Sequence, residues 1–188
     1  KTIFLPTQAA TDLDILPKIL KSLDNRAKII MTTGFIASAN GGEKLAQLAQ
    51  IRWPLPQIQS VAETIISEGT PFNLKLPISM DYQIISDGAK TLLQTSESDS
   101  KSFLIQNQSK NVFVINSHTF SQEDFDAVGE VLLCPRQLGL LEFPKPWINT
   151  IRSAFHSVDE PVIDAPSRVS MQQLSDRSII IHNYNQEK

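Results

Sequence analysis

The sequence has a single cysteine, no excess of either charge and no long apolar run, and each of these shortages excludes a class of protein. Cys134 stands alone, so the chain can build neither an internal disulfide framework nor a metal site of several cysteines. The 17 Lys and Arg against 20 Asp and Glu give a net charge of −3, which provides no basic field for a nucleic-acid backbone. No apolar stretch approaches the roughly 20 residues that span a bilayer. We therefore predict neither a nucleic-acid partner nor a membrane span.

The first residues also lack the features of a secretion signal. Residues 1–6 contain neither a long apolar segment nor a cleavage site. The chain does not begin with Met, which is typical of a mature or excised piece, so we expect a longer parent polypeptide. The compartment stays unknown, with a periplasmic or secreted location slightly favoured over a cytoplasmic one.

What the sequence does contain is a β-α-β pattern near its start. Residues 2–5 are apolar and are followed by proline, which predicts a first buried strand. Apolar spacing predicts a helix over 14–23, with Asp14 as the N-cap and Pro17 as the third helical residue, where no intrahelical bond is lost. The run 27–33 predicts a strand buried on both faces. Because strand, helix and strand in this order form parallel crossovers, we expect an α/β sheet.

Two apolar runs, 102–107 and 111–116, are joined by a short polar segment and predict a hairpin. The second run is the most strand-like segment of the chain, and we expect it at the centre of the sheet. Residues 57–66 leave helix and strand open, because β-branched residues dominate while their spacing is roughly helical. Shorter signals predict a helix at 43–51, a strand at 72–76 and an amphipathic helix at 147–155.

The pattern divides the chain into two domains. Residues 1–158 form the predicted α/β domain, and residues 159–188 form a linker and a β-hairpin. Within the second part, residues 159–166 carry two prolines, which favours a linker. The strands predicted at 168–174 and 178–184 form a hairpin that is marginally stable alone, so it either docks on the main domain or begins a further β domain.

Candidate site residues follow the predicted strands. In open α/β sheets, ligands bind beyond the carboxyl ends of the strands. Thr33 and Gly34 follow the second predicted strand, and Ser117 and His118 follow the central one, so these four are candidate ligand-facing residues. A histidine without a second ligand or a paired carboxylate is more often a hydrogen-bonded structural residue, and we assign no catalytic residue.

The other chemistry-bearing residues favour structural roles. Cys134 lies between an apolar run and a proline, which favours a packed thiol over a nucleophile. The histidines are far apart in sequence and lack short ligand spacing, so we predict no metal and no cofactor. The glycines are too sparse for a dinucleotide fingerprint, and Thr32-Thr33-Gly34 is interpreted as a turn. Asn107-Gln108-Ser109 matches a glycosylation acceptor by motif alone.

Several stretches together resemble a known family in hydrophobic pattern and order. The family is the glutamine-amidotransferase-like, flavodoxin-type accessory domain of β-galactosidase-like glycoside hydrolases. The resemblance implies an α/β fold: a flavodoxin-like three-layer sandwich with a mostly parallel sheet, plus a C-terminal β-hairpin or partial β domain. The similar stretches are 2–6, 14–23, 27–34, 89–95, 101–107 and 111–116, and residues 178–185 resemble the opening of the C-terminal β domain.

The resemblance also implies that the hydrolytic machinery is absent. Amidotransferases of this shape place a cysteine on a tight strand-to-helix turn, with a histidine later in the chain. Here the turn at Thr33-Gly34-Phe35 has no cysteine, and Cys134 comes after His118.

We therefore expect a non-catalytic accessory or assembly domain of a larger carbohydrate-active protein. Its expected partners are the rest of that polypeptide, with a second copy of the chain and a carbohydrate as further candidates. The alternative is a stand-alone small hydrolase or sugar-binding protein with a site at the strand ends, using His118 with Ser117 or Thr33. Whether the chain is itself an enzyme stays open.

Overall fold

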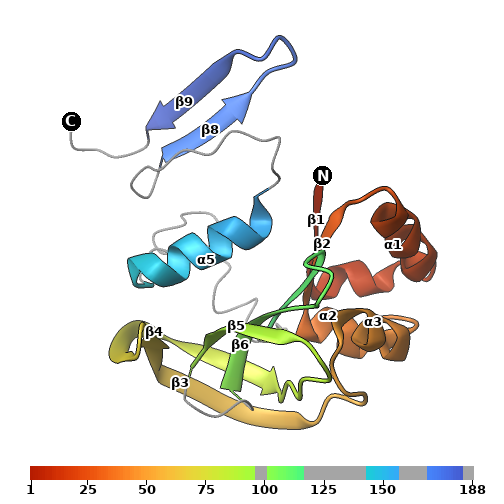
Figure 1. Cartoon of the computed structure of the whole chain (residues 1–188), viewed down its shortest axis with the longest axis vertical. Helices are drawn as coiled ribbons and strands as arrows, with labels where there is room; N and C mark the ends of the chain where they lie inside the picture. Colours follow the sequence, from red (N-terminus) through yellow and green to blue (C-terminus); the bar gives the residue numbers. More distant parts are fainter. Residues whose placement is uncertain (96–100, 117–142, 157–168, 184–188) are drawn as a thin grey trace. The chain divides into compact units, whose positions relative to one another are not determined.

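The computed structural model describes residues 1–95, 101–116, 143–156 and 169–183. The chain falls into two compact units, Lys1–Ser157 and Val158–Lys188, and each is described by itself. The first unit is a mixed α/β structure built on a five-stranded sheet (Figure 1). The predicted linker lies outside the described residues.

The five-stranded sheet is mixed and has the strand order β1-β2-β7-β6-β5. β1, β2 and β7 pair in parallel, whereas β6 is antiparallel to both β7 and β5. The expected mostly parallel sheet is therefore not confirmed, because the short connection between β6 and β7 forces an antiparallel pairing. The strands are β1 (Thr2–Leu5), β2 (Lys28–Thr32), β5 (Lys90–Gln94), β6 (Ser102–Gln106) and β7 (Val112–Ile115).

The predicted β-α-β unit is present. Helix α1 (Ile15–Asp24) connects β1 to β2, with Asp14 at its N-cap and Pro17 at its third position, although the Asp14 side chain makes no capping hydrogen bond. The residues of β2 are buried except for the half-buried Lys28, as expected for an internal strand. β1 is instead an edge strand on which Phe4 is 46% exposed, so the prediction of a buried first strand is wrong.

β6 and β7 form the predicted hairpin, and β7 lies at the centre of the sheet as predicted. Asn107 fastens the hairpin, because its Oδ1 accepts the backbone N–H groups of Asn111 and Val112 at 3.1 and 3.2 Å. Its Nδ2 donates to the carbonyl of Leu48 at 3.2 Å and to Asn111 Oδ1 at 3.0 Å. The amide nitrogen of the matched glycosylation motif is thus engaged in the fold, in a residue that is 8% exposed.

The segment for which helix and strand stayed open is a strand. β3 (Gln57–Ser67) pairs antiparallel with β4 (Thr70–Tyr82) in a two-stranded ribbon, shown beside β5 and β6 in Figure 1. Exposed and half-buried residues alternate along most of β3, which is the period of a strand. The preference of β-branched residues for strands therefore prevailed over the helical spacing.

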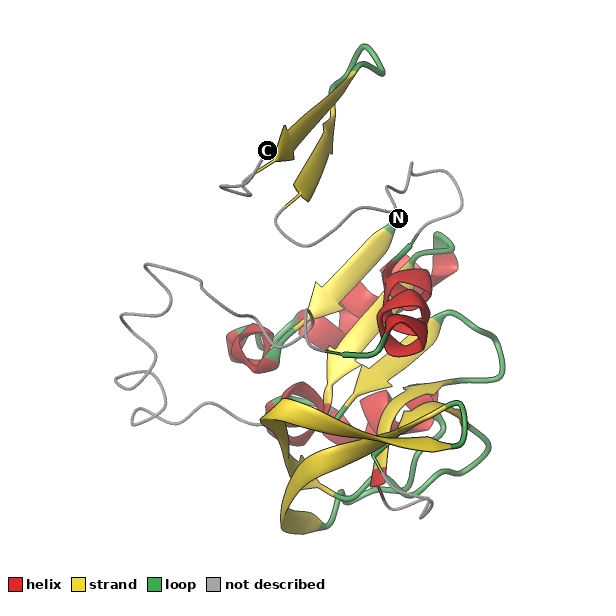
Figure 2. Cartoon of the chain, turned by 90° about the vertical axis from the view of Figure 1, so that its left-hand side faces the viewer, coloured by secondary structure: helices red, strands yellow, loops and turns green. Residues whose placement is uncertain are grey.

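Two apolar cores lie on opposite faces of the five-stranded sheet, because successive side chains of a strand point to opposite sides (Figure 2). On one face, Ile29 and Met31 pack with α1, α2 and α3. On the other face, Ile30 packs with α5 and with Ile65 of the β3–β4 ribbon. The helices are α2 (Thr33–Ser38), α3 (Gly42–Ala49), α5 (Lys145–Phe155) and the short 3-10 helix η1 (Thr7–Thr11), which contacts α2.

The described residues of the second unit form a hairpin, as predicted. β8 (Val169–Gln173) pairs antiparallel with β9 (Ile179–Asn183). All five residues of β9 are exposed.

Candidate functional site

The carboxyl ends of the parallel strands β1, β2 and β7 meet at one edge of the sheet. This is the edge at which α/β domains bind ligands. Thr33 and Gly34, two of the four predicted site residues, lie here as the first residues of α2. Ser117 and His118, the other two, lie outside the described residues.

The segment Thr32-Thr33-Gly34 begins a helix, so its interpretation as a turn is wrong. Thr32 is the N-cap of α2, and its Oγ1 accepts the backbone N–H of Phe35 at 3.1 Å. A threonine at this position satisfies one of the first amide groups of a helix, which have no intrahelical partner. Gly34 is buried in the first turn of α2.

A buried polar network connects Thr33 to the end of β7. Thr33 Oγ1 donates to Asn116 Oδ1 at 3.2 Å, and both residues are 0% exposed. Asn116 Nδ2 donates to the carbonyls of Tyr82 at 2.8 Å and Ser102 at 3.2 Å. Its backbone N–H donates to the Phe103 carbonyl at 2.8 Å. Asn116 thus joins four elements of the fold, and its polar atoms are used by the protein itself.

Sequence reasoning missed Asn116. The available signal was its place directly after the most strand-like run of the chain, where a polar residue at the carboxyl end of a central strand is worth testing.

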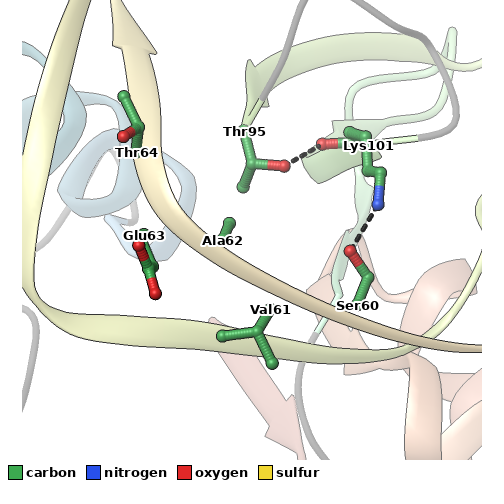
Figure 3. A pocket seen from close by; sticks show the side chains of 7 residues that line it. All are labelled: Ser60, Val61, Ala62, Glu63, Thr64, Thr95 and Lys101. Carbon is green, nitrogen blue, oxygen red and sulfur yellow. Dashed lines mark hydrogen bonds between the residues drawn. The ribbon is translucent and has the colours of Figure 1, made fainter.

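A pocket of ≈ 340 Å³ opens between the β3–β4 ribbon and the ends of β5 and β6 (Figure 3). We call it the Lys101 pocket, and residues 60–64, Thr95 and Lys101 line it. Lys101 Nζ donates to Ser60 Oγ across the gap between the two sheets. Thr95, 5% exposed, donates its Oγ1 to the Lys101 carbonyl at 3.1 Å. No sequence motif announces this site, because its two walls come from separate parts of the chain.

The remaining titratable candidates have structural positions or lie outside the description. His156 is the C-cap of α5, and His182 belongs to β9. Cys134 is not among the described residues. Within residues 1–95, 101–116, 143–156 and 169–183, no three His, Cys, Asp or Glu side chains gather closely enough to hold a metal ion. In the same ranges, no helix combines the length and apolarity needed to cross a bilayer.

The acidic residues before α1 serve the helix start. The Lys18 ammonium, and then the backbone N–H of Asp14, donate to Asp12 and hold the pKa of its carboxyl below the usual value. The same pair raises the pKa of Lys18. Both side chains are open to solvent, so this is a surface ion pair and not an acid/base pair of a site.

Comparisons with known proteins find little that is similar to this chain. No protein-family model matches it, and no curated protein matches it. Among solved structures, the chain is similar to the structure of PurLQS from Thermotoga maritima at 17% identity. That similarity covers 65% of this chain and 68% of the other, with a TM-score of 0.38.

These findings correct the resemblance to the accessory domain of glycoside hydrolases, which is wrong. The structural comparison leads to PurLQS and not to a glycoside hydrolase. The physical reason lies in the kind of resemblance, which consisted of hydrophobic pattern and order of elements. Such patterns are shared by many unrelated α/β domains.

Proposed function

We propose that this chain is a non-catalytic accessory unit that acts in protein assembly, with the rest of a larger polypeptide as its partner. The carbohydrate-active parent depended on the corrected resemblance and is not carried into this proposal. Two observations support the assembly role: the use of the carboxyl-edge polar groups by the fold itself, and the apolar face of the β8–β9 ribbon. The second observation carries the proposal.

One face of the β8–β9 ribbon is apolar. The register places Met171 opposite Ile181 and Gln173 opposite Ile179, and residues directly opposite each other share a face. With Val169, two positions before Met171, this face presents four apolar side chains. Ile179 and Ile181 are 49% and 58% exposed. The opposite face carries the pair Gln172 and Ile180 together with the pair Ser170 and His182.

A two-stranded ribbon has no second layer with which to cover such a face, and alone it is marginally stable. Neither apolar core that the described residues form includes a residue of β8 or β9. Contiguous exposed apolar faces are typical of protein interaction sites. Full burial of an isoleucine side chain contributes about 1.5–3 kcal/mol, so covering this face is favourable.

The scaffold of the unit Lys1–Ser157 supports a flavodoxin-like description in part. Its parallel strands β1, β2 and β7 include one β-α-β crossover, and structure covers both faces of the sheet. We therefore include the three-layer, flavodoxin-like scaffold in the proposal.

The alternative hydrolase used His118 with Ser117 or Thr33. Thr33 Oγ1 donates its hydrogen to Asn116 in a fully buried position, which disfavours it as a nucleophile. Hydrolysis of p-nitrophenyl esters or glycosides by the purified chain, lost in His118→Ala, would support the hydrolase and oppose the non-catalytic role.

The assembly role is tested on the complete gene product with the variants Ile181→Lys and Gln172→Lys, which alter opposite faces of the ribbon. Lysine at position 181 places a charge on the apolar face, so we expect faster amide hydrogen exchange across residues 179–183 in that variant only. Wild-type protein in which residues 179–183 exchange at unprotected rates contradicts the proposal. A doubled mass in light scattering assigns the face to a second copy of the chain instead.

A further inference from the structure

The Lys101 pocket contains hydrogen-bond donors that the fold leaves unused. A lysine ammonium has three N–H groups, and the structure uses one of them for Ser60 Oγ. Among the residues that the structure describes, the ion pair is that of Lys18 with Asp12, so Lys101 has no acidic partner there. The Ser60 hydroxyl accepts from Lys101, and the described residues offer no acceptor for its hydrogen. Two ammonium N–H groups and one hydroxyl are therefore available beside the same cavity.

The surroundings of Lys101 strengthen these donors. Lys101 is half-buried between two sheets, and partly buried charges are less screened by salt than exposed ones. Figure 3 shows Thr95 and Lys101 on one side of the pocket, facing Ser60 and Ala62 on the other. The Thr95 hydroxyl donates to the Lys101 carbonyl, which fixes the backbone from which the ammonium extends.

We infer that the Lys101 pocket binds a small carboxylate, held between Lys101 Nζ and Ser60 Oγ. Hydrogen bonds from an ammonium to a carboxylate oxygen are about twice as strong as neutral ones. The volume of ≈ 340 Å³ is enough for a small ligand, since such sites measure about 300–1,000 Å³. Glu63 also lines the pocket, and its charge opposes a second negative charge on the ligand. A monoanionic carboxylate is therefore favoured over dianionic phosphate.

The site is separate from the β8–β9 ribbon, so its test does not depend on the proposed assembly role. The probes are sodium acetate and inorganic phosphate, titrated at constant ionic strength into the full chain labelled for amide NMR. Acetate should give saturable shifts at the amides of Ser60, Ala62 and Lys101, and phosphate should bind more weakly. Glu63→Gln should bring phosphate closer to acetate.

Variants separate the site from the general charge of the surface. Lys101→Met should weaken acetate binding by about tenfold or more, and Lys101→Arg should retain most of it. Lys110→Met, an exposed lysine at the far end of β6, serves as the matched control and should leave binding unchanged. Ser60→Ala keeps the charge and should weaken binding by a smaller factor.

Thermal melting confirms that each variant is folded before its titration is interpreted. Shifts that rise linearly without saturation, or that are equal in Lys101→Met and wild type, overturn the inference. Unfolding of Lys101→Met leaves Ser60→Ala as the deciding variant, and unchanged acetate binding in that variant also overturns it.

Discussion

At the scale of single residues, Asn116 does the most to hold the carboxyl edge together. Its side chain joins the start of α2 to the ends of β4 and β6, and all of this lies in a buried environment. A buried polar network in low dielectric is stable when satisfied and costly when broken. The edge where many α/β domains bind a ligand is therefore, in this chain, a joint between elements.

Asn116→Ala removes two donated hydrogen bonds and one accepted bond from this joint. We expect a loss of about 3 kcal/mol or more in the free energy of unfolding, because buried groups lose their partners. Urea unfolding followed by circular dichroism measures it. Asn149→Ala, at an exposed position of α5, should change stability by less than about 0.5 kcal/mol. Similar small effects in both variants would show that the network is not structurally important.

At the scale of elements, α5 is attached to the sheet at both of its ends. Near its start, Trp147 is 1% exposed, donates Nε1 to the Ile66 carbonyl at 2.8 Å and stacks on Phe103. At its end, Lys28 Nζ donates to the carbonyls of Ser153 and His156. The last carbonyls of a helix carry partial negative charge, so a lysine from β2 is a favourable partner for them.

Lys28→Met keeps the apolar stem of the side chain and removes the charge at the end of α5. We expect a loss of about 1–2 kcal/mol in the free energy of unfolding, the range for a partly buried cation at a helix C-terminus. Lys90→Met, on the exposed side of β5, is the control and should change stability by less than about 0.5 kcal/mol. Equal losses in the two variants would mean that helix α5 does not depend on this lysine.

The elements that the sequence predicted well are those whose signals are local. The β-α-β unit, the β6–β7 hairpin and the β8–β9 hairpin follow from spacing and turns within short stretches. The two sites depend on distant contacts. Thr33 and Asn116 are 83 residues apart in sequence, and Ser60 and Lys101 are 41 apart. Pattern within a window carries no information on such pairings, so the joint at Asn116 and the Lys101 pocket were not predictable.

At the scale of the whole molecule, the two units differ in how they are stabilised. Both apolar cores formed by the described residues belong to Lys1–Ser157. The β8–β9 ribbon has an apolar face but no core residue of its own in these clusters. The first unit therefore has the interior of an independent domain, whereas the ribbon has the composition of a surface that is completed by other protein.

A chain ending at Ser157 should accordingly fold and melt cooperatively, because it retains both cores. We expect its melting temperature to differ from that of the full chain by no more than about 3 °C, which corresponds to about 1 kcal/mol for a domain of this size. A chain ending at residue 143 serves as the control, since it loses α5 and with it the buried Trp147, and it should lose cooperative melting altogether. Calorimetry on the three chains decides the matter. If removal of the ribbon abolishes the cooperative transition, its apolar face is an internal part of the fold, and the assembly role proposed for that face fails with it.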